Sequence, residues 1–378
     1  MTKNGRISYK ENNEKNQIAK TGKKRFSLRK KLVLIFGFLI AAALTIAALI
    51  TIRNARKAVL EKVEAHLTDK ATDIAEVIDG RISSVVQFIE GLARMPFLRN
   101  NSMTLTEKAE LLIKEAERNK KIDYFGICDM QGNRYDGTGL RMSVKDREWF
   151  KAASQGKNFI NEPAISSITN NMQIILAVPI YDDDNAIIGV LNAAVPAQLL
   201  SDEINDIVVG QTGECYIIGL TGTAIAHKNF DAVTKQRNMI EEGKNDKNLA
   251  SLSKFLQHAL DTDASEVGYY DYDDISNIAS YATVKITGWT VIIKAPVKEF
   301  IKTVDDLRMS IRILGIIILI ITLAVIYAVA HYMLQPIRKM VTALKDIAHG
   351  EGDLTVRLPV AGNDEITDLS EYFNQTIE

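Results

Sequence analysis

The hydrophobic pattern of the chain is dominated by two long stretches without charge. Residues 32–52 are uncharged throughout, and a helix of that length spans the roughly 30 Å hydrocarbon core of a bilayer. A second apolar stretch, residues 313–334, is bounded by Arg312 and by the basic pair Arg338-Lys339. Both stretches predict transmembrane helices. A cleaved signal peptide is the alternative for the first, although its apolar run is longer than a typical signal core and shows no small-x-small cleavage pattern.

The pattern between the two stretches, over residues 53–312, changes from helical to strand-like. Apolar residues first recur with helical spacing for about ten turns, which predicts one long helix. They are Val59, Val63, Leu67, Ala71, Ile74, Ile78, Val85, Ile89 and Leu92. Beyond Pro96, short segments rich in β-formers predict antiparallel strands. They are residues 124–128, 173–178, 187–195, 216–218 and 289–293.

Turn residues separate these predicted strands in a repeated manner. Residues 129–133, 182–185 and 220–223 each place Asp, Asn or Gly where a hairpin needs a positive φ or an Asx turn. The spacing predicts two similar sheet modules in tandem, a distal one at about 96–200 and a proximal one at about 201–305. The fold class is therefore α+β.

Charge decides the expected orientation in the membrane. The formal net charge is only −1, but residues 1–31 carry eleven Lys or Arg against Glu11 and Glu14. Basic residues beside a membrane span favour the cytoplasmic side, so this tail predicts cytoplasmic N- and C-termini and an extracytoplasmic segment 53–312. The same run is interpreted as a topology anchor rather than a nucleic-acid patch.

Residues with catalytic or metal-binding chemistry are sparse. Cys128 and Cys215 show no CxxC or Cys/His spacing, so two buried thiols are favoured over a single bridge, which stays open. His227 is a lone histidine at a predicted strand end, and the acidic group at 271–274 is interpreted as a solvated turn. No Ser/His/Asp spacing, metal cluster or phosphate loop is visible, which makes an extracellular enzyme the weakest hypothesis and predicts no cofactor and no metal.

The segment after the second apolar stretch, residues 335–378, predicts a dimeric helical relay. Gln335-Pro336 is expected to open a helix, Gly350–Asp353 to break it, and Asp364-Glu365 to start a second helix. Apolar residues with coiled-coil spacing follow both starts, which implies a homodimer. They are Ile337, Met340, Leu344 and Ile347 in the first helix and Ile366, Leu369 and Phe373 in the second.

Two parts of the chain resemble known families. The runs 146–150 (DREWF), 162–163 (EP) and 189–191 (GVL), followed by 210–218 and 222–227, resemble a double Cache sensor domain. The resemblance implies a long helix followed by two PAS-like antiparallel-sheet modules. The runs 350–355 (GEGDLT) and 364–374 resemble a HAMP domain, most closely that of methyl-accepting chemotaxis proteins.

The Cache resemblance implies a ligand pocket in the distal module. Arg147 is expected to grip a carboxylate with two hydrogen bonds while Trp149 and Phe150 exclude water. Ser166, Thr169 and Asn170 are candidates for the remaining hydrogen bonds. Family members that bind amino acids hold the ammonium group with acidic residues, and an aromatic residue precedes the arginine.

In this sequence those positions are occupied by Ser166, Ala194 and Met142. A buried ammonium group without a counter-charge would be costly, so the expected ligand is a small carboxylate without that group. The alternative to a ligand pocket is that Arg147 forms an ion pair with a nearby acidic residue and that the aromatic residues only fill the core.

Together these features favour a membrane-embedded chemoreceptor without enzymatic activity. The sensor half of a histidine kinase or of a diguanylate cyclase is the alternative, because such proteins share the same sensor and relay. The sequence ends at Glu378 without a methylated signalling hairpin, so cytoplasmic partners are expected to act through a region that this chain does not contain.

Overall fold

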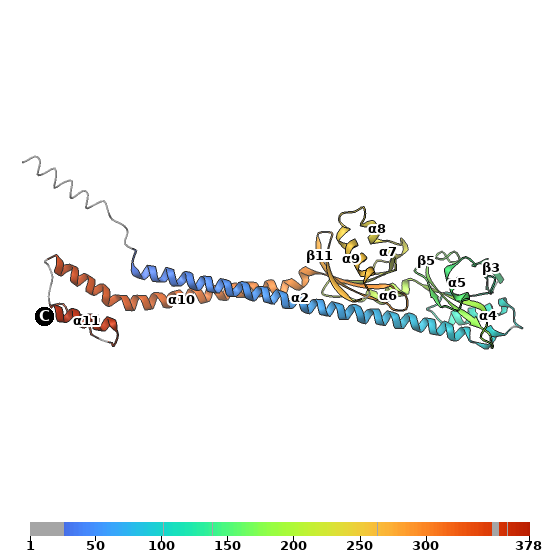
Figure 1. The fold of residues 1–378 in the computed structure, drawn as a ribbon, viewed down its shortest axis with the longest axis horizontal. Coiled ribbons are helices and arrows are strands. Elements are labelled where there is room, and N and C mark those ends of the chain that lie inside the picture. The colour runs from blue at the N-terminus through green and yellow to red at the C-terminus, as the bar shows by residue number, and fades with distance from the viewer. Residues whose placement is uncertain (1–25, 101, 138, 263, 350–354, 361) are drawn as a thin grey trace, which may run out of the picture. The chain divides into compact units, whose positions relative to one another are not determined.

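The computed structural model describes residues 26–100, 102–137, 139–262, 264–349, 355–360 and 362–378. The chain divides into two compact units, one of residues 56–304 and one of residues 1–55 with 305–378. Figure 1 shows the ribbon with its elements labelled. Most of the basic N-terminal tail and the run 350–354 lie outside the described residues, so the structure does not bear on the interpretations placed on them.

The first long element is helix α2 (Leu28–Ala93), which contains the whole first apolar stretch. In the sensor unit its predicted stripe is buried from Leu67 to Leu92 except for the half-buried Val85, and the same hydrophobic core takes in side chains from two β-sheets. The part of α2 that belongs to this unit runs along both sheet modules (Figure 1). An apolar helix face and an apolar sheet face are stable in water only when they cover each other. The stability of α2 and that of the two modules therefore depend on the same contact.

The distal module is built on an antiparallel seven-stranded sheet with the order β3-β2-β1-β7-β6-β4, in which β5 also pairs with β6. Its strands are β1 (Tyr124–Cys128), β2 (Asn133–Asp136), β3 (Gly139–Ser143), β4 (Phe159–Ile160), β5 (Ala164–Ile165), β6 (Met172–Tyr181) and β7 (Ile187–Pro196). Helices α3 (Pro96–Arg99), α4 (Leu105–Arg118) and α5 (Glu148–Ser154) complete it. Thr104 and Glu107 form a capping box that fixes the start of α4.

The proximal module has a five-stranded antiparallel sheet with the order β10-β11-β12-β8-β9. Its elements are α6 (Gln198–Asn205), β8 (Glu214–Ile218), β9 (Ala224–His227), α7 (Asp231–Thr234), α8 (Met239–Glu242), α9 (Ala250–Asp261), β10 (Glu266–Tyr272), β11 (Ile275–Thr283) and β12 (Thr290–Pro296). The five predicted strand segments match β1, β6, β7, β8 and β12, and the predicted α+β class with two tandem sheet modules is confirmed.

The predicted turns form as their residues require. The Asp129 carboxylate accepts hydrogen bonds from the backbone N–H groups of Gln131 and Asn133 at 3.0 and 2.8 Å, and Gly132 adopts a φ of 83°. Asp273 and Asp274 have φ values of 52° and 58° and join β10 to β11 in a two-residue turn. The acidic cluster is therefore a hairpin turn of the type that needs two positive φ angles.

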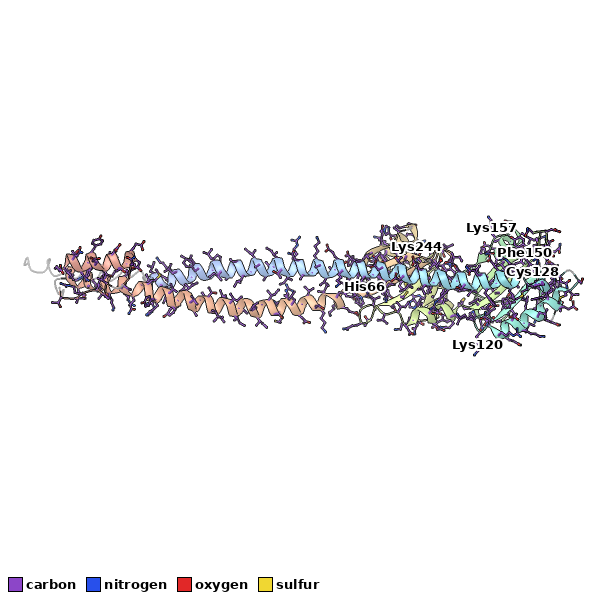
Figure 2. The ribbon with its side chains drawn as sticks, turned by 90° about the horizontal axis from the view of Figure 1, so that it is seen from below. His66, Lys120, Cys128, Phe150, Lys157 and Lys244 are labelled. Atoms are coloured by element: carbon purple, nitrogen blue, oxygen red, sulfur yellow. The ribbon has the colours of Figure 1, made fainter. Side chains whose placement is uncertain are left out.

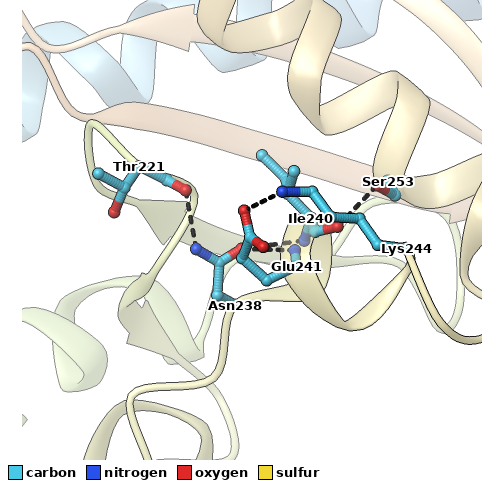
Figure 3. Close-up of polar contacts among 6 residues, drawn as sticks. All are labelled: Thr221, Asn238, Ile240, Glu241, Lys244 and Ser253. Atoms are coloured by element: carbon cyan, nitrogen blue, oxygen red, sulfur yellow. Dashed lines mark hydrogen bonds and ion pairs between the residues drawn. The ribbon is translucent and has the colours of Figure 1, made fainter.

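A side-chain cap connects two loops of the proximal module (Figure 3). The Asn238 side chain accepts from the N–H groups of Ile240 and Glu241 at 3.0 and 3.1 Å, which caps the short helix α8. Its Nδ2 donates to the Thr221 carbonyl oxygen at 2.8 Å, and the Ser253 hydroxyl donates to the Ile240 carbonyl oxygen. The turn between β8 and β9 is thus held against α8 and α9.

The other unit contains the two apolar helices and the segment after them. Helix α10 (Val297–Ala348) includes the second apolar stretch, and α2 and α10 are both long and apolar enough to cross a membrane. A Cβ on Gly37 of α2 would lie 2.8 Å from the Cδ2 atom of Leu323 in α10, so the Leu323 side chain packs against α2 at this glycine. Pro336 lies inside α10 rather than at a helix start. The prediction of a new helix at Gln335-Pro336 was wrong, because the preceding span continues through that position.

The end of the chain folds back on α10. Asp364 caps helix α11 (Glu365–Thr376) by accepting from the Thr367 N–H at 2.9 Å, as the Asp-Glu start predicted. The Asn374 side chain accepts from the Leu358 N–H and donates to its carbonyl oxygen, both at 2.8 Å. Met340, Leu358 and Phe373 are buried together. The predicted order of helix, extended connector and helix is present in the described residues.

Two neighbouring residues of a distal-module loop form hydrogen bonds with the proximal module. Glu162, in the loop between β4 and β5, accepts a hydrogen bond from the backbone N–H of Leu220 at 2.8 Å. The carbonyl oxygen of the next residue, Pro163, accepts from the Gln236 side chain at 3.2 Å. Gly219 has no space for a Cβ because the Glu162 carboxylate lies against its backbone. The turn after β8 is therefore in direct contact with a distal-module loop.

We expect Glu162→Ala to speed amide exchange at Leu220 by about tenfold, because a hydrogen bond to a charged acceptor is lost. Hydrogen-exchange mass spectrometry of the peptide around Leu220 measures this effect. Glu117→Ala, an exposed acidic residue on α4, is the matched control and should leave the exchange unchanged. Equal exchange in wild type and Glu162→Ala would show that this contact does not protect the turn.

Candidate ligand-binding site

The distal module encloses a polar cavity of about 370 Å³. Its floor is formed by side chains from the adjacent strands β1, β2 and β7 and from β6. Its rim is formed by two segments, residues 146–149 at the start of α5 and residues 164–168 around β5. The cavity therefore lies between the central strands of the sheet and the two loops that the Cache resemblance marked.

The structure brings three of the six predicted ligand residues to this cavity. Arg147, Trp149 and Ser166 line it. Arg147 is exposed at the rim, where its guanidinium makes no hydrogen bond or ion pair with any described residue. The Ser166 hydroxyl lies 3.3 Å from the Tyr124 hydroxyl and accepts from the Ile168 and Thr169 N–H groups.

The other three predicted residues do not line the cavity. Phe150 is 4 % exposed and packs in a separate small core with Cys128 and Val144 (Figure 2 labels Phe150 and Cys128). Successive helical residues point about 100° apart, so when Trp149 faces the cavity its neighbour faces the core. Thr169 and Asn170 are exposed and form the loop before β6, where Asn170 has a φ of 58°. Asn170 donates its N–H to the Ser166 carbonyl oxygen and so shapes the rim.

Arg134, which the sequence analysis did not single out, is the most unusual residue in the cavity. It is 3 % exposed, and its guanidinium lies over the Tyr124 ring with 5.1 Å to the ring centroid. Its Nε donates to the Asn192 Oδ1 at 3.4 Å, while its buried Nη1 has no partner among the described residues. No described carboxylate forms an ion pair with it. A buried cation therefore faces the cavity without a counter-charge.

Glycine at position 126 makes room for this arginine. A Cβ on Gly126 would collide with the Arg134 guanidinium and with the Asn192 side chain. These three residues lie on the neighbouring strands β1, β2 and β7, with Gly126 paired directly with Asn192. The buried guanidinium thus depends on a close approach across the centre of the sheet.

Gln173 adds a second unsatisfied polar group to the cavity. It is 1 % exposed, and its Nε2 donates to the Asp123 carboxylate. Its buried Oε1 has no partner among the described residues. Buried polar groups without partners are costly in water-free surroundings, so Arg134 and Gln173 mark positions that a polar ligand would satisfy.

The acidic residues that line the cavity are Asp146 and Glu148, both exposed at the rim. Of the positions assigned to the ammonium group, Ser166 lines the cavity, and Ala194 is fully buried in β7 between Tyr124 and Ile175. Met142 also lines the cavity. Within the described residues, the interior of the cavity carries positive charge and neutral polar groups.

A second cavity, of about 520 Å³, lies between α2 and the sheets and is lined mainly by apolar side chains such as Val85, Phe88 and Leu176. None of the unsatisfied buried polar atoms of the described residues lies in it. Because small-ligand sites combine a concave surface with a few convergent polar groups, the polar cavity is the better candidate.

The remaining candidate residues are structural in the described part of the chain. Cys128 and Cys215 are buried and unbridged, as the favoured interpretation predicted, and burial raises the pKa of each thiol to about 12. His227 stacks on Tyr216 and its Nδ1 accepts from the Asn229 N–H at 2.9 Å. Burial lowers the pKa of His227. The described residues contain no group of three His, Cys, Asp or Glu that could hold a metal ion.

The sequence matches two family models. The model of the Cache domain covers residues 51–304, and the model of the HAMP domain covers residues 328–378. This chain belongs to the Cache domain family. The recognised order of a Cache sensor followed by HAMP is thereby confirmed, and the two apolar helices flank the sensor as in a two-pass membrane receptor.

Curated relatives align with nearly the whole chain. The methyl-accepting chemotaxis protein PscA of Pseudomonas syringae pv. tomato is 21 % identical over 365 residues, covering 94 % of this chain and 55 % of PscA. McpB of Bacillus subtilis is 21 % identical over 371 residues, covering 93 % of this chain and 51 % of McpB. The chain therefore spans about half the length of these relatives.

Solved sensor domains share the fold. The ligand-binding domain of the Pseudomonas fluorescens chemoreceptor CtaA, solved with L-isoleucine, aligns with a TM-score of 0.52 at 16 % identity and covers 66 % of this chain and 98 % of that domain. An extracellular domain assigned to the histidine kinase mmHK1S-Z3 aligns with a TM-score of 0.51 at 12 % identity. The alignment covers 64 % of this chain and 97 % of that domain. The same fold thus serves more than one class of receptor.

We expect Gly126→Ala to lower the unfolding free energy by about 1–3 kcal/mol, because the added methyl group meets a buried guanidinium and a buried amide that have little space to move. Thermal unfolding of the full chain in lipid nanodiscs measures the change. Gly91→Ala in α2 is the control, since a Cβ there meets nothing within 4 Å and alanine favours a helix. Unchanged stability in Gly126→Ala would contradict the tight packing at this position.

Proposed function

We propose that this chain is the sensor half of a transmembrane chemoreceptor that binds a small extracellular ligand in the distal cavity and relays the signal through HAMP. The observation that carries the proposal is the continuity of α10. It begins directly after β12 of the proximal sheet and runs without interruption through the apolar span into the HAMP segment. A helix is a stiff element, so a displacement at the sheet reaches HAMP as a movement of this helix.

The proposed ligand carries a carboxylate that binds Arg147. The solved domains of CtaA and of the Campylobacter jejuni chemoreceptor Tlp3 contain isoleucine, which supports a small ligand of this kind. The interior of the present cavity has no described acidic residue to balance an ammonium group. A carboxylate ligand without an ammonium group in the usual place therefore fits best, with Trp149 and Ser166 beside it.

The proposed output is chemotaxis, with cytoplasmic signalling partners bound by the part of such receptors that this chain does not span. PscA and McpB, the two curated relatives named above, are both methyl-accepting chemotaxis proteins, which supports this choice. The sensor half of a histidine kinase is the second candidate, because a kinase-associated extracellular domain has the same fold. Neither function requires catalysis by the residues of this chain.

The proposed assembly is a homodimer through the HAMP segment. Leu344 of α10 and Leu369 of α11 occupy coiled-coil seam positions, yet they are 50 % and 43 % exposed in the single chain. A second copy would cover such residues in a parallel bundle. A dimeric mass of the full chain in detergent supports this assembly, and a monomeric mass refutes it.

We expect Arg147→Ala to weaken the binding of small carboxylates at least tenfold, because a charge-assisted hydrogen-bond pair is lost. Calorimetry on the full chain in nanodiscs, with lactate, pyruvate and succinate as probes, measures this loss. Lys157→Ala is the charge-matched control, because Lys157 is exposed on the same module outside the cavity (Figure 2). A carboxylate that binds equally well to Arg147→Ala would refute the assignment.

The proposed topology predicts which introduced cysteines an impermeant thiol reagent reaches. Lys157→Cys should be labelled in intact cells from which any outer membrane has been removed, and Lys345→Cys only after lysis. Both positions are exposed, and the native cysteines are buried, so background labelling is low. Labelling of Lys157→Cys only after lysis would place the sensor domain in the cytoplasm and end the receptor proposal.

A further inference from the structure

The unpaired cation at the floor of the cavity gives information about the ligand beyond the carboxylate at the rim. Arg134 is 3 % exposed, and its Nε donates a hydrogen bond to a neutral amide, that of Asn192, at 3.4 Å. A buried charge without an opposite charge is strongly unfavourable, and a neighbouring aromatic face offsets only part of that cost. Its burial indicates that an anion completes the site when the receptor is occupied.

The two arginines lie at different depths of the same cavity. Arg147 is exposed on the rim, at the residue that precedes α5, whereas Arg134 comes from β2 in the floor. Both line the cavity, and neither is paired with a described carboxylate. The exposed rim acids Asp146 and Glu148 are in contact with water and are screened by salt. The cavity thus presents one cation at its entrance and one at its base.

We propose that the ligand is an organic diacid, held by Arg147 through one carboxylate and by Arg134 through the other. The proposal rests on the proposed ligand pocket and names the class of ligand that the pocket selects. An anion at the base offsets the charge of Arg134 and accepts from its unpartnered Nη1. A monocarboxylate satisfies only one of the two cations, so the second charge contributes specificity as well as affinity.

Gln173 favours a hydroxyl group on that diacid. One N–H of its Nε2 donates to Asp123, which orients the amide, and its unpartnered Oε1 is an acceptor that a donor on the ligand would satisfy. An ammonium group could also donate to it, but the buried positive charge of Arg134 in the same cavity opposes a second cation there. A hydroxyl donor satisfies Gln173 without that repulsion.

The test compares a diacid with its own monoamide. Calorimetry on the full chain in nanodiscs near neutral pH uses succinate and succinamate, which have the same length and differ by one charge. We expect wild type to bind succinate at least tenfold more tightly than succinamate. Malate should bind more tightly than succinate through its hydroxyl group, and aspartate more weakly than malate.

Variants of Arg134 distinguish a direct contact from a structural role. Arg134→Gln should bind succinate and succinamate equally, and Arg134→Lys should keep a preference for the diacid. Without ligand, Arg134→Gln should unfold at the same temperature as wild type or higher, because an uncompensated buried charge is removed. Loss of the preference together with intact folding therefore assigns the contact to Arg134.

Two results overturn the diacid proposal. One is equal binding of succinate and succinamate to wild type, and the other is a preference that survives in Arg134→Gln. If lactate or pyruvate still binds and depends on Arg147 in that case, the proposed pocket stands and only the diacid inference fails. If no small carboxylate binds to wild type, both the pocket and the diacid proposal fail.

Discussion

The buried stripe of α2 is the contact on which the sensor domain depends. Each sheet has one apolar face that must be covered, and the buried stripe residues of α2 between Leu67 and Leu92 belong to the core shared by both sheets. Trp289, directly before β12 of the proximal sheet, and Ile174 of the distal sheet belong to that single core. The two modules are therefore not independently folding domains, because removal of α2 would expose apolar surface on both of them.

The periodicity of apolar residues in the sequence was sufficient to predict the course of α2 and several strands in both sheets. The stripe of α2, the strands β6 and β7 and the Asp129 turn follow from local rules, because apolar spacing and turn chemistry act over a few residues. The helix start at Pro336 was placed wrongly for the same reason. A local rule reads proline as a first-turn residue, whereas α10 accepts it in its interior, where one backbone hydrogen bond is lost.

The candidate site could be predicted only in part. Arg147 and Trp149 were found through a motif that is contiguous in sequence, but Phe150 of the same motif points into the core, since helical rotation separates neighbours. Arg134 lies in the four-residue strand β2, whose polar sequence Asn-Arg-Tyr-Asp is typical of an exposed edge strand. Its burial depends on Gly126 and Asn192 from other strands, and no spacing along the chain reveals that these three residues meet.

One short loop contributes residues both to the cavity wall and to the contact with the proximal module. Residues 161–166 supply Asn161, Ala164 and Ser166 to the cavity wall, and between them Glu162 and Pro163 contact the proximal module. Glu162 holds the turn that follows β8, and β8 pairs with β12, which leads into α10. Residues that line the cavity therefore stand on both sides of the two residues that contact the proximal module. A ligand that moves this loop therefore changes the contact with the β8 turn as well, and the strand pair β8–β12 is a covalent and hydrogen-bonded route from that turn to α10.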